Sequence, residues 1–376
     1  MNLYHQIYLS TTELPAQWNE VAQSSIFLQT NYLRALEQSR PTNISISYVG
    51  IFQDSQLVAA AFIQQIDLNQ LETFGVRDNG LKIKIRDFLF KNYAGKLLII
   101  GNNMLTGQHA IACRPEISPK IILSYLKEKV CKEYPSQHLE IFKDFPTEEL
   151  SFFSGSGFDH SLRFTSQPSM FLTLENGWAK EKDYVNALSK KYRDQYKRAR
   201  KKADGIEKRQ LNLTEIIELE SRIYELYVHV AKNAPFNTFF LVKNHFSCLK
   251  ENMGESFRFF AYFEEGKLIG FNTLFQHDEL LETYFLGYDP SIQKNKMLYL
   301  NMLYDMVGCA IVNGFKHIQF GRTAMEIKSS IGAIPVNMYG LMEHNTPWIN
   351  SYLDKIFRFL EPEVTWTQRH PFKEKS

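Results

Sequence analysis

An internal repeat limits the folds that this chain of 376 residues can adopt. The segment FQDSQLVAAAFIQQ begins at Phe52, and the similar segment FEEGKLIGFNTLFQ begins at Phe263. Each copy starts with Phe, continues through mostly polar residues to Leu, and then becomes apolar, which is typical of a strand, a tight turn and a second strand. A chain that contains the same hairpin twice is expected to fold as two similar halves.

A second pair of segments supports the repeat. HLEIF (138–142) follows a helix-like segment over 121–134, and HIQF (317–320) follows another over 297–315. Apolar residues recur in both helix-like segments at helical spacing, which indicates amphipathic helices. The order of hairpin, helix and strand therefore occurs twice. It predicts an α/β (α+β) fold with tandem domains, each a mostly antiparallel mixed sheet flanked by helices.

The composition changes near the middle of the chain. Gly, Ser and Pro are concentrated in SGSGFDHSLRFTSQPS (154–169), a pattern that favours a loop or linker. We place the domain boundary here and expect an N-terminal domain over 1–160 and a C-terminal domain over 161–376. The total length is comfortable for two domains of ordinary size.

Charge and cysteine usage exclude several classes of protein. The net charge is only +2, so no general attraction to DNA is expected. The four cysteines have no C-x-x-C spacing and the histidines have no H-x-x-x-H spacing, so we expect reduced thiols and no metal. The chain begins without a secretory signal, and its longest apolar runs are far shorter than the ~20 residues that cross a bilayer. These features predict a soluble cytoplasmic protein without a transmembrane segment.

A strongly basic helix is predicted over 184–203, with Gly205 as its C-cap. Within 189–202 a single acidic residue, Asp194, accompanies eight basic ones. The basic residues are Lys190, Lys191, Arg193, Lys197, Arg198, Arg200, Lys201 and Lys202. Such a surface can be simply solvated, can dock an acidic acyl-carrier protein, or can bind tRNA or anionic lipid headgroups.

Polar side chains follow the predicted strand 317–320 directly. Strand ends in α/β proteins are rigid and usually face a crevice, so we expect a functional site here. The candidate residues of this segment are Arg322, Thr323, Glu326, Lys328, Ser329 and Ser330.

The order of these features over 184–345 resembles the C-terminal half of the Fem-like branch of the GNAT acyltransferases, which includes the peptidoglycan aminoacyltransferases and related acetyltransferase domains. The motifs that carry the resemblance are Lys191-Tyr192-Arg193 with Arg198 and Arg200, Gly266 and Gly270 in the hairpin, Phe320-Gly321-Arg322, and Lys328 with Gly332-Ala333. The resemblance implies that residues 161–376 form a catalytic GNAT-like domain. The internal repeat then makes 1–160 a degenerate second copy.

The resemblance also implies the transfer of an acyl group from a thioester or ester to an amine. In GNAT folds two neighbouring strands separate and leave a slot for the donor; here they would be 280–288 and 316–322. The helix between them would offer its N-terminal N–H groups to a phosphate, with Gln293, Lys294, Asn295 and Lys296 as cofactor-binding residues. The family's glycines are missing from this stretch. The resemblance implies acyl-CoA as a co-substrate that is not tightly bound, and the missing glycines leave room for an acyl-carrier protein or a charged tRNA as the donor instead.

Roles can be assigned to single residues on this basis. Arg322 would hold an anionic group or pair with Glu326, and Glu326 would act as a general base in a closed cleft. Tyr284 would protonate the leaving thiolate. Substrate binding is expected for Lys328 as an anion anchor, and for Thr323, Ser329, Ser330, Asn272 and Tyr288. For the hydroxyl residues, capping of the loop is the alternative.

We therefore predict an N-acyltransferase that transfers an acyl group from acyl-CoA or an acyl-carrier protein to a small-molecule or lipid amine, such as a cell-envelope precursor. The aromatic segment NAPFNTFFLV (233–242), with Phe236, Phe239 and Phe240, favours a lipid-like substrate. Two alternatives stay open. One is an aminoacyl-tRNA-dependent peptidoglycan or peptide aminoacyltransferase, and the other is a non-catalytic GNAT-like binding module.

Overall fold

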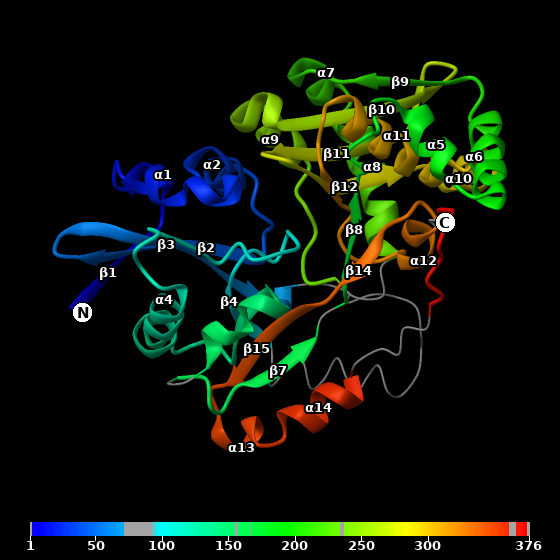
Figure 1. The fold of residues 1–376 in the computed structure, drawn as a ribbon. Coiled ribbons are helices and arrows are strands. Elements are labelled where there is room, and N and C mark those ends of the chain that lie inside the picture. The colour runs from blue at the N-terminus through cyan, green and yellow to red at the C-terminus, as the bar shows by residue number, and fades with distance from the viewer. Residues whose placement is uncertain are drawn as a thin grey trace. The chain divides into compact units, whose positions relative to one another are not determined.

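The computed structural model divides the chain into two compact units (Figure 1). Unit 1 comprises residues 1–166, 235–248 and 337–363, and unit 2 comprises residues 167–234, 249–336 and 364–376. The structure describes residues 2–70, 93, 95–154, 157–165, 167–233, 237–360 and 366–373. The first change of unit falls close to the boundary expected at 160. The contiguous C-terminal domain expected over 161–376 is, however, interrupted by two segments that belong to unit 1.

Unit 1 contains a mixed sheet in which the only parallel pair among the described strands is β4 with β6. In sheet order its strands are β1 (Leu3–Tyr8), β2 (Ile44–Gln53), β3 (Gln56–Asp67), β4 (Lys96–Ile100), β6 (Leu139–Pro146), β15 (Met338–His344) and β7 (Leu162–Thr165), and β5 (Ile111–Cys113) also pairs with β3. Its helices are α1 (Trp18–Val21), α2 (Thr30–Gln38), α4 (Pro119–Tyr125), α13 (Pro347–Asn350) and α14 (Leu353–Leu360). The predicted hairpin at Phe52 is the β2–β3 pair.

Long-range hydrogen bonds attach the segment 235–248 to unit 1. The Asn43 side chain donates to the Thr238 carbonyl oxygen (2.9 Å), and the Asn103 side chain donates to the Thr238 hydroxyl (2.6 Å). His245 is fully buried, and its Nδ1 lies 3.0 Å from the Ser39 hydroxyl at the end of α2. The residues in these contacts lie between 135 and 206 positions apart in sequence, so local sequence patterns could not reveal them.

Unit 2 repeats the arrangement with a second mixed sheet, in which β12 and β13 form the parallel pair. In sheet order its strands are β14 (Ile334–Val336), β8 (Ser169–Thr173), β13 (His317–Gln319), β12 (Leu280–Tyr288), β11 (Lys267–His277), β10 (Phe257–Glu264) and β9 (Ile206–Gln210). Its helices are α5 (Glu181–Ala187), α6 (Lys190–Lys202), α7 (Leu213–Glu218), α8 (Glu220–Lys232), α10 (Pro290–Lys296), α11 (Leu298–Val312) and α12 (Met325–Ser329), while α9 (His245–Met253) begins in unit 1 and ends in unit 2. The predicted fold class, two mostly antiparallel mixed sheets flanked by helices, is confirmed.

Helices pack closely on the sheet of unit 2, and two glycines permit this approach. A Cβ at Gly270 of β11 would lie 2.6 Å from the Met302 side chain of α11. A Cβ at Gly287 of β12 would lie 2.6 Å from the backbone carbon of Leu226 and 2.7 Å from the backbone nitrogen of Tyr227, both in α8. Helix α11 is buried on nearly all sides, and this burial explains why its sequence is almost uniformly apolar.

Gly287→Ala is expected to lower the free energy of unfolding by about 1–3 kcal/mol, because the added methyl group meets backbone atoms that cannot move without shifting α8. Gly177→Ala is the matched control, since a Cβ at Gly177 has nothing within 4 Å. Urea denaturation of both variants measures the difference. Equal stability of the two variants would contradict the packing argument.

Candidate active site

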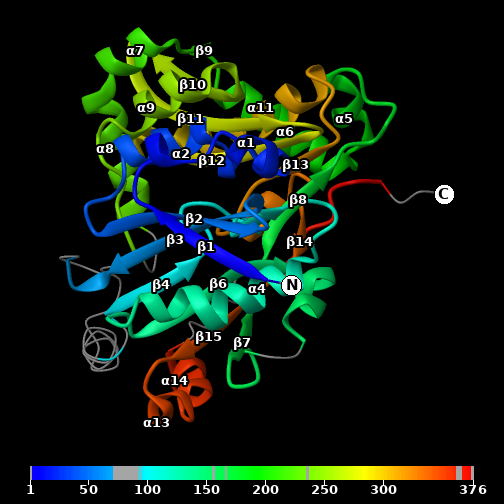
Figure 2. The same ribbon diagram turned by 90° about the vertical axis from the view of Figure 1, so that its left-hand side faces the viewer.

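The strands β12 and β13 lie side by side only over a short stretch. Their parallel pairing begins at Leu280 and ends at Glu282. The chain after β13 then follows β8, because the Phe320 N–H donates to the Met170 carbonyl oxygen (2.8 Å). In the described part of the chain, 283–288 pairs with a strand only on its β11 side. The expected separation of the two strands is therefore confirmed, and Figure 2 labels both strands.

A β-bulge lies where the strands separate. Tyr284 and Phe285 of β12 stand opposite Thr273 of β11, one residue beyond the end of the pairing with β13 at Glu282. The Thr273 hydroxyl donates to the Phe285 carbonyl oxygen (2.6 Å) and fixes the bulge. The Tyr284 ring packs against Phe275 and Phe285, with ring centroids 5.0 and 4.5 Å away. Bulges are common beside active sites because they redirect side chains and end strand pairing.

The polar loop after β13 has unusual backbone geometry. Gly321, Thr323 and Ala324 all have positive φ angles, of 63°, 63° and 48°. This conformation is rare for a β-branched residue such as Thr, and each such residue costs on the order of 1–3 kcal/mol. Thr323 is exposed and Arg322 is half-buried at the start of this loop. Strain of this kind is concentrated at functional sites, so it supports the predicted location of the site.

Lys328 fixes the strained loop through hydrogen bonds to its backbone. Its side chain is buried, and Nζ donates to the carbonyl oxygens of Phe320 (2.7 Å), Gly321 (3.4 Å) and Arg322. Burial lowers the pKa of Lys328 to about 7. The ammonium group is thus directed at backbone carbonyls, and we interpret Lys328 as a clamp of the loop, whereas the sequence suggested an anion anchor.

Glu326 does not have the environment expected for a general base. Its side chain is 50% exposed and forms an ion pair with Arg369, near the end of the chain. The sequence suggested Arg322 or Lys328 as its partner and a closed cleft around it. The structure corrects both expectations. Arg369 comes from a distant part of the sequence, so no local pattern connects it with Glu326.

The two serines of the segment have capping contacts. Ser329 Oγ donates to the Glu326 carbonyl oxygen (2.8 Å) and accepts from the Arg369 N–H (3.0 Å). Ser330 Oγ donates to the Ile327 carbonyl oxygen (2.7 Å). Both are buried. The capping alternative therefore describes these hydroxyls better than contact with a substrate.

Asn272 is buried in a polar network. Its Nδ2 donates to the Tyr262 hydroxyl (2.8 Å), which donates to Asp305 of α11 (2.9 Å), and Asp305 pairs with Arg200 of α6 (2.7 Å). Burial raises the pKa of Tyr262 well above its ordinary value, so its hydroxyl stays protonated and can donate. The network joins the basic helix to the sheet. Sequence reasoning identified Asn272 and Arg200 but missed Tyr262 and Asp305, which alternation alone could not distinguish from packed residues.

Tyr288 lies at the end of β12. It is half-buried, and its ring centroid is 6.2 Å from that of Tyr299 and 6.3 Å from that of His229. Burial raises the pKa of Tyr288, so the hydroxyl remains a proton donor at neutral pH. Tyr284 and Tyr288 both lie on β12, one of the two strands that separate, as the sequence predicted.

The segment expected to bind a phosphate forms a short helix, α10. At Met297 (φ 49°) the chain passes from α10 into α11, which corresponds to the helix expected over 297–315. The Asp289 carboxylate caps the N-terminus of α10 by accepting from the Ser291 N–H (3.0 Å), and it pairs with Arg222 (2.7 Å). A carboxylate at this position repels a phosphate from the N-terminus of α10.

The four residues predicted to bind the cofactor are spread along α10. Lys294 and Asn295 are exposed, Gln293 is half-buried, and Lys296 pairs with Glu264 (2.7 Å). They do not converge on one point in front of the helix N-terminus. Within the described ranges, no group of three His, Cys, Asp or Glu side chains could hold a metal ion. No described helix is long and apolar enough to cross a membrane.

Lys328→Met is expected to lower the free energy of unfolding by about 1–3 kcal/mol, because buried carbonyl groups lose their donor. The effect should grow with pH. The folded state releases the Lys328 proton near pH 7 and the unfolded chain near pH 10.5, so the unfolded state binds more protons between these values and Lys328 adds stability as the pH rises. Urea denaturation at about pH 6 and about pH 9 tests this. Lys294→Met is the exposed control, and a difference that shrinks at high pH would contradict the prediction.

Comparisons with known proteins agree with this geometry. Residues 124–374 match the FemAB-like family, described as peptidoglycan biosynthesis/recognition. No curated protein matches the chain. Among solved structures, FemX is similar with a TM-score of 0.53 and 10% identity, over 91% of this chain and 97% of that one. A tandem GNAT protein from the clavulanic acid biosynthesis pathway, solved without AcCoA, has a TM-score of 0.50 and 9% identity, over 92% and 99% of the two chains.

The structural similarities show a tandem GNAT-like fold, in agreement with the two related sheets. The family match covers two thirds of the chain, including all of β9–β14 and the separation of β12 from β13. The chain therefore belongs to the FemAB-like family.

Proposed function

We propose that unit 2 is an N-acyltransferase that takes an aminoacyl group from an ester on tRNA and transfers it to an amine of a cell-envelope precursor. The observation that carries this proposal is the separation of β12 from β13 directly beside the bulge at Tyr284 and Phe285. An extended donor can lie along the open side of β12 as an added strand.

The chemistry requires no covalent intermediate on the protein. The acceptor amine attacks the ester carbonyl, a C–N bond forms, and the C–O bond to the ribose breaks. Backbone N–H groups at the bulge stabilise the negative charge on the carbonyl oxygen. The attacking amine loses one proton and the leaving ribose oxygen gains one, so the step is balanced. Tyr284 of β12 is the candidate donor of the proton to the ribose oxygen. Arg322 holds an anionic group of the donor or the acceptor.

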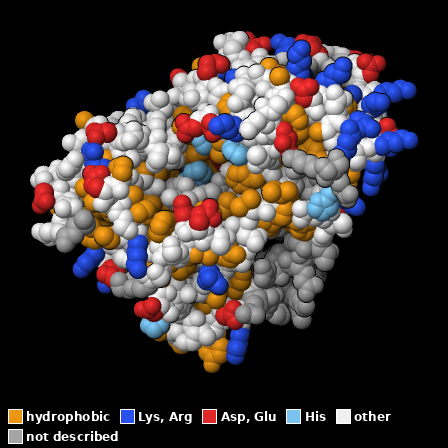
Figure 3. All heavy atoms as spheres, viewed as in Figure 1, with side chains coloured by type: hydrophobic (Ala, Val, Ile, Leu, Met, Phe, Trp, Pro, Cys, Tyr) orange, Lys and Arg blue, Asp and Glu red, His pale blue; other side chains and the backbone are white. Residues whose placement is uncertain are grey.

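The charge distribution of unit 2 favours tRNA over free acyl-CoA. The Asp289 carboxylate caps the N-terminus of α10, so this helix end does not attract a phosphate. Helix α6 instead presents a row of exposed cations, and Figure 3 shows Lys and Arg side chains gathered where α6 lies in Figure 1. The exposed cations are Lys190, Lys191, Lys197, Arg198, Lys201 and Lys202. A phosphate backbone is the natural partner of such a row.

The acceptor is proposed from the family, whose description concerns peptidoglycan. A lipid amine was suggested by the aromatic segment 233–242. Phe236 lies outside the described residues, and Phe239 and Phe240 are half-buried in unit 1, whereas the separated strands belong to unit 2. The family description favours a peptide amine as the acceptor. An acidic acyl-carrier protein is the second candidate donor, because the same exposed face of α6 would attract it.

Neutralising the exposed face of α6 is expected to weaken tRNA binding at least about tenfold and to reduce the slope of log affinity against log salt by roughly 3. The variant combines K197Q, R198Q, K201Q and K202Q. The affinity is measured by fluorescence anisotropy over a salt series. Transfer of a labelled amino acid from charged tRNA to a peptide amine is measured in parallel and should fall with the affinity.

The matched control removes the same charge from exposed lysines of unit 1. It combines K120Q, K129Q, K132Q and K243Q and should leave the salt slope unchanged. If wild-type protein binds no tRNA at low salt but accepts acyl groups from a carrier protein, the second donor is correct. If it binds tRNA but transfers nothing to any amine, unit 2 is a binding module and the proposed activity is wrong.

A further inference from the structure

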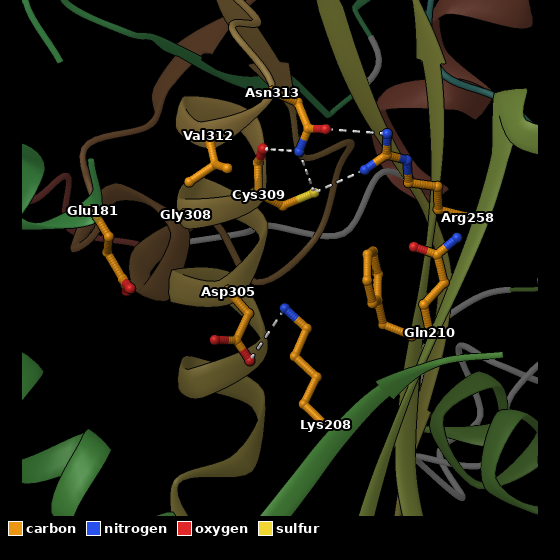
Figure 4. Close-up of a pocket in the computed structure, with 10 residues that line it drawn as sticks. Glu181, Lys208, Gln210, Arg258, Asp305, Gly308, Cys309, Val312 and Asn313 are labelled. Atoms are coloured by element: carbon orange, nitrogen blue, oxygen red, sulfur yellow. Dashed lines mark hydrogen bonds and ion pairs between the residues drawn. The ribbon is translucent and has the colours of Figure 1, made fainter. Parts of the chain in front are cut away.

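Unit 2 contains a pocket of about 340 Å³ between strands β9 and β10 on one side and helix α11 on the other (Figure 4). It is lined by Glu181, Lys208, Gln210, Arg258, Phe260, Asp305, Gly308, Cys309, Val312 and Asn313. None of these residues belongs to β12, β13 or the loop 320–330. A ligand bound here would therefore be additional to the donor and the acceptor of the proposed transfer.

The guanidinium group of Arg258 is half-buried at one end of this pocket and faces α11. Its Nη2 donates to the Asn313 side-chain oxygen (3.2 Å), and its Nη1 lies 3.8 Å from the sulfur of Cys309, which is a weak acceptor. Its Nε is buried and makes no hydrogen bond. Neither partner is a carboxylate. Because a partly buried cation is stabilised by an anion, this end of the pocket favours a negatively charged group.

The other charged groups of the pocket compensate one another. Arg200, which is not part of the lining, pairs with Glu181 (2.5 Å) and with Asp305 (2.7 Å). Lys208 Nζ lies 3.9 Å from Asp305 Oδ2. The two carboxylates are thus matched by two cations, which leaves Arg258 as the lining cation without a carboxylate partner. A ligand with a single negative charge would complete the balance.

Apolar side chains lie next to Arg258 on both walls of the pocket. Phe260 is two residues farther along β10, so its side chain leaves the same face of the strand roughly 7 Å away. On α11, Val312 directly precedes Asn313 and is 71% exposed. Both side chains line the pocket. A ligand whose charged group pairs with Arg258 can therefore place an apolar body against Phe260 and Val312.

We propose that this pocket binds a small organic monocarboxylate, with its carboxylate on the Nη atoms of Arg258 and its apolar body against Phe260 and Val312. The guanidinium fork matches the planar carboxylate, whose oxygen is a better acceptor than the Cys309 sulfur. Phosphate carries additional charge at neutral pH that no lining cation would match, so it binds more weakly. The volume is at the lower end of the range of ligand pockets and suits a compact ligand.

The test uses the full chain without tRNA or any acyl donor, so that its result does not depend on the proposed transfer activity. The probes are sodium benzoate and sodium hexanoate, and titration calorimetry at constant ionic strength measures their affinities. At least one of them should bind saturably, with one site per chain. Benzamide and hexanamide, which have nearly the same shape without the charge, and inorganic phosphate should each bind at least tenfold more weakly.

Two variants locate the binding site. Asn313→Asp places a carboxylate where the amide oxygen now accepts from Arg258, so the cation becomes paired within the protein and probe binding should fall at least tenfold. Arg258→Gln removes the cation and should also weaken the binding at least tenfold. The first variant keeps the test valid if the second is unstable, because it supplies a partner to Arg258 and does not remove one.

Asn233→Asp is the matched control for Asn313→Asp. Asn233 follows α8 as Asn313 follows α11, and each side-chain nitrogen donates to the carbonyl oxygen four residues earlier, of His229 (2.8 Å) and of Cys309 (2.7 Å). Both variants lose this bond and add a negative charge at a helix end, but the control should bind the probes as the wild type does. Absence of saturable binding, unchanged binding in Asn313→Asp, or equal binding of the amides or of phosphate would overturn the proposal.

Discussion

The short parallel pairing of β12 with β13 determines where unit 2 is open. It ends at Glu282, where β12 bulges at Tyr284 and Phe285 and the chain after β13 turns to pair with β8. Backbone groups of a buried strand must normally be paired, so a strand left without a neighbour on one side favours an extended ligand in that place. The bulge, the strained loop at Thr323 and the clamp by Lys328 all lie around this point.

The polar network behind the sheet connects this opening with the basic helix. Asp305 of α11 is bound by Tyr262 and by Arg200, and Tyr262 in turn binds Asn272. A buried network of this kind fixes the position of each member, because removing one partner leaves the others unsatisfied. Helix α6 is therefore anchored on one face through Arg200, while six of its other lysines and arginines remain exposed. A helix that is anchored on one face and exposes its cations on the other can serve as a docking surface for a polyanion.

Several charged residues have partners in the structure that change the role expected of them from the sequence. Glu326 is paired with Arg369, Asp289 caps α10 and pairs with Arg222, and Lys328 is directed at backbone carbonyls. Each was a candidate for, or lay beside, a catalytic or phosphate-binding position in the sequence. The residue type alone fixes which chemistry is possible. The nearest partner in space decides which chemistry is used, because a paired or hydrogen-bonded charge is no longer available to a substrate.

The separated strands were expected from the family resemblance, whereas the sequence by itself determined the repeated hairpin, the two sheets flanked by helices and the basic helix. These features follow from alternation, helical spacing and charge along short stretches, all of which are local. Only the tertiary structure decided that 235–248 and 337–363 belong to unit 1, that Arg369 neutralises Glu326, and that Asp305 joins Tyr262 to Arg200. Such relations depend on distances between residues remote in sequence, which are fixed by how the helices and strands pack and not by the order of neighbouring side chains.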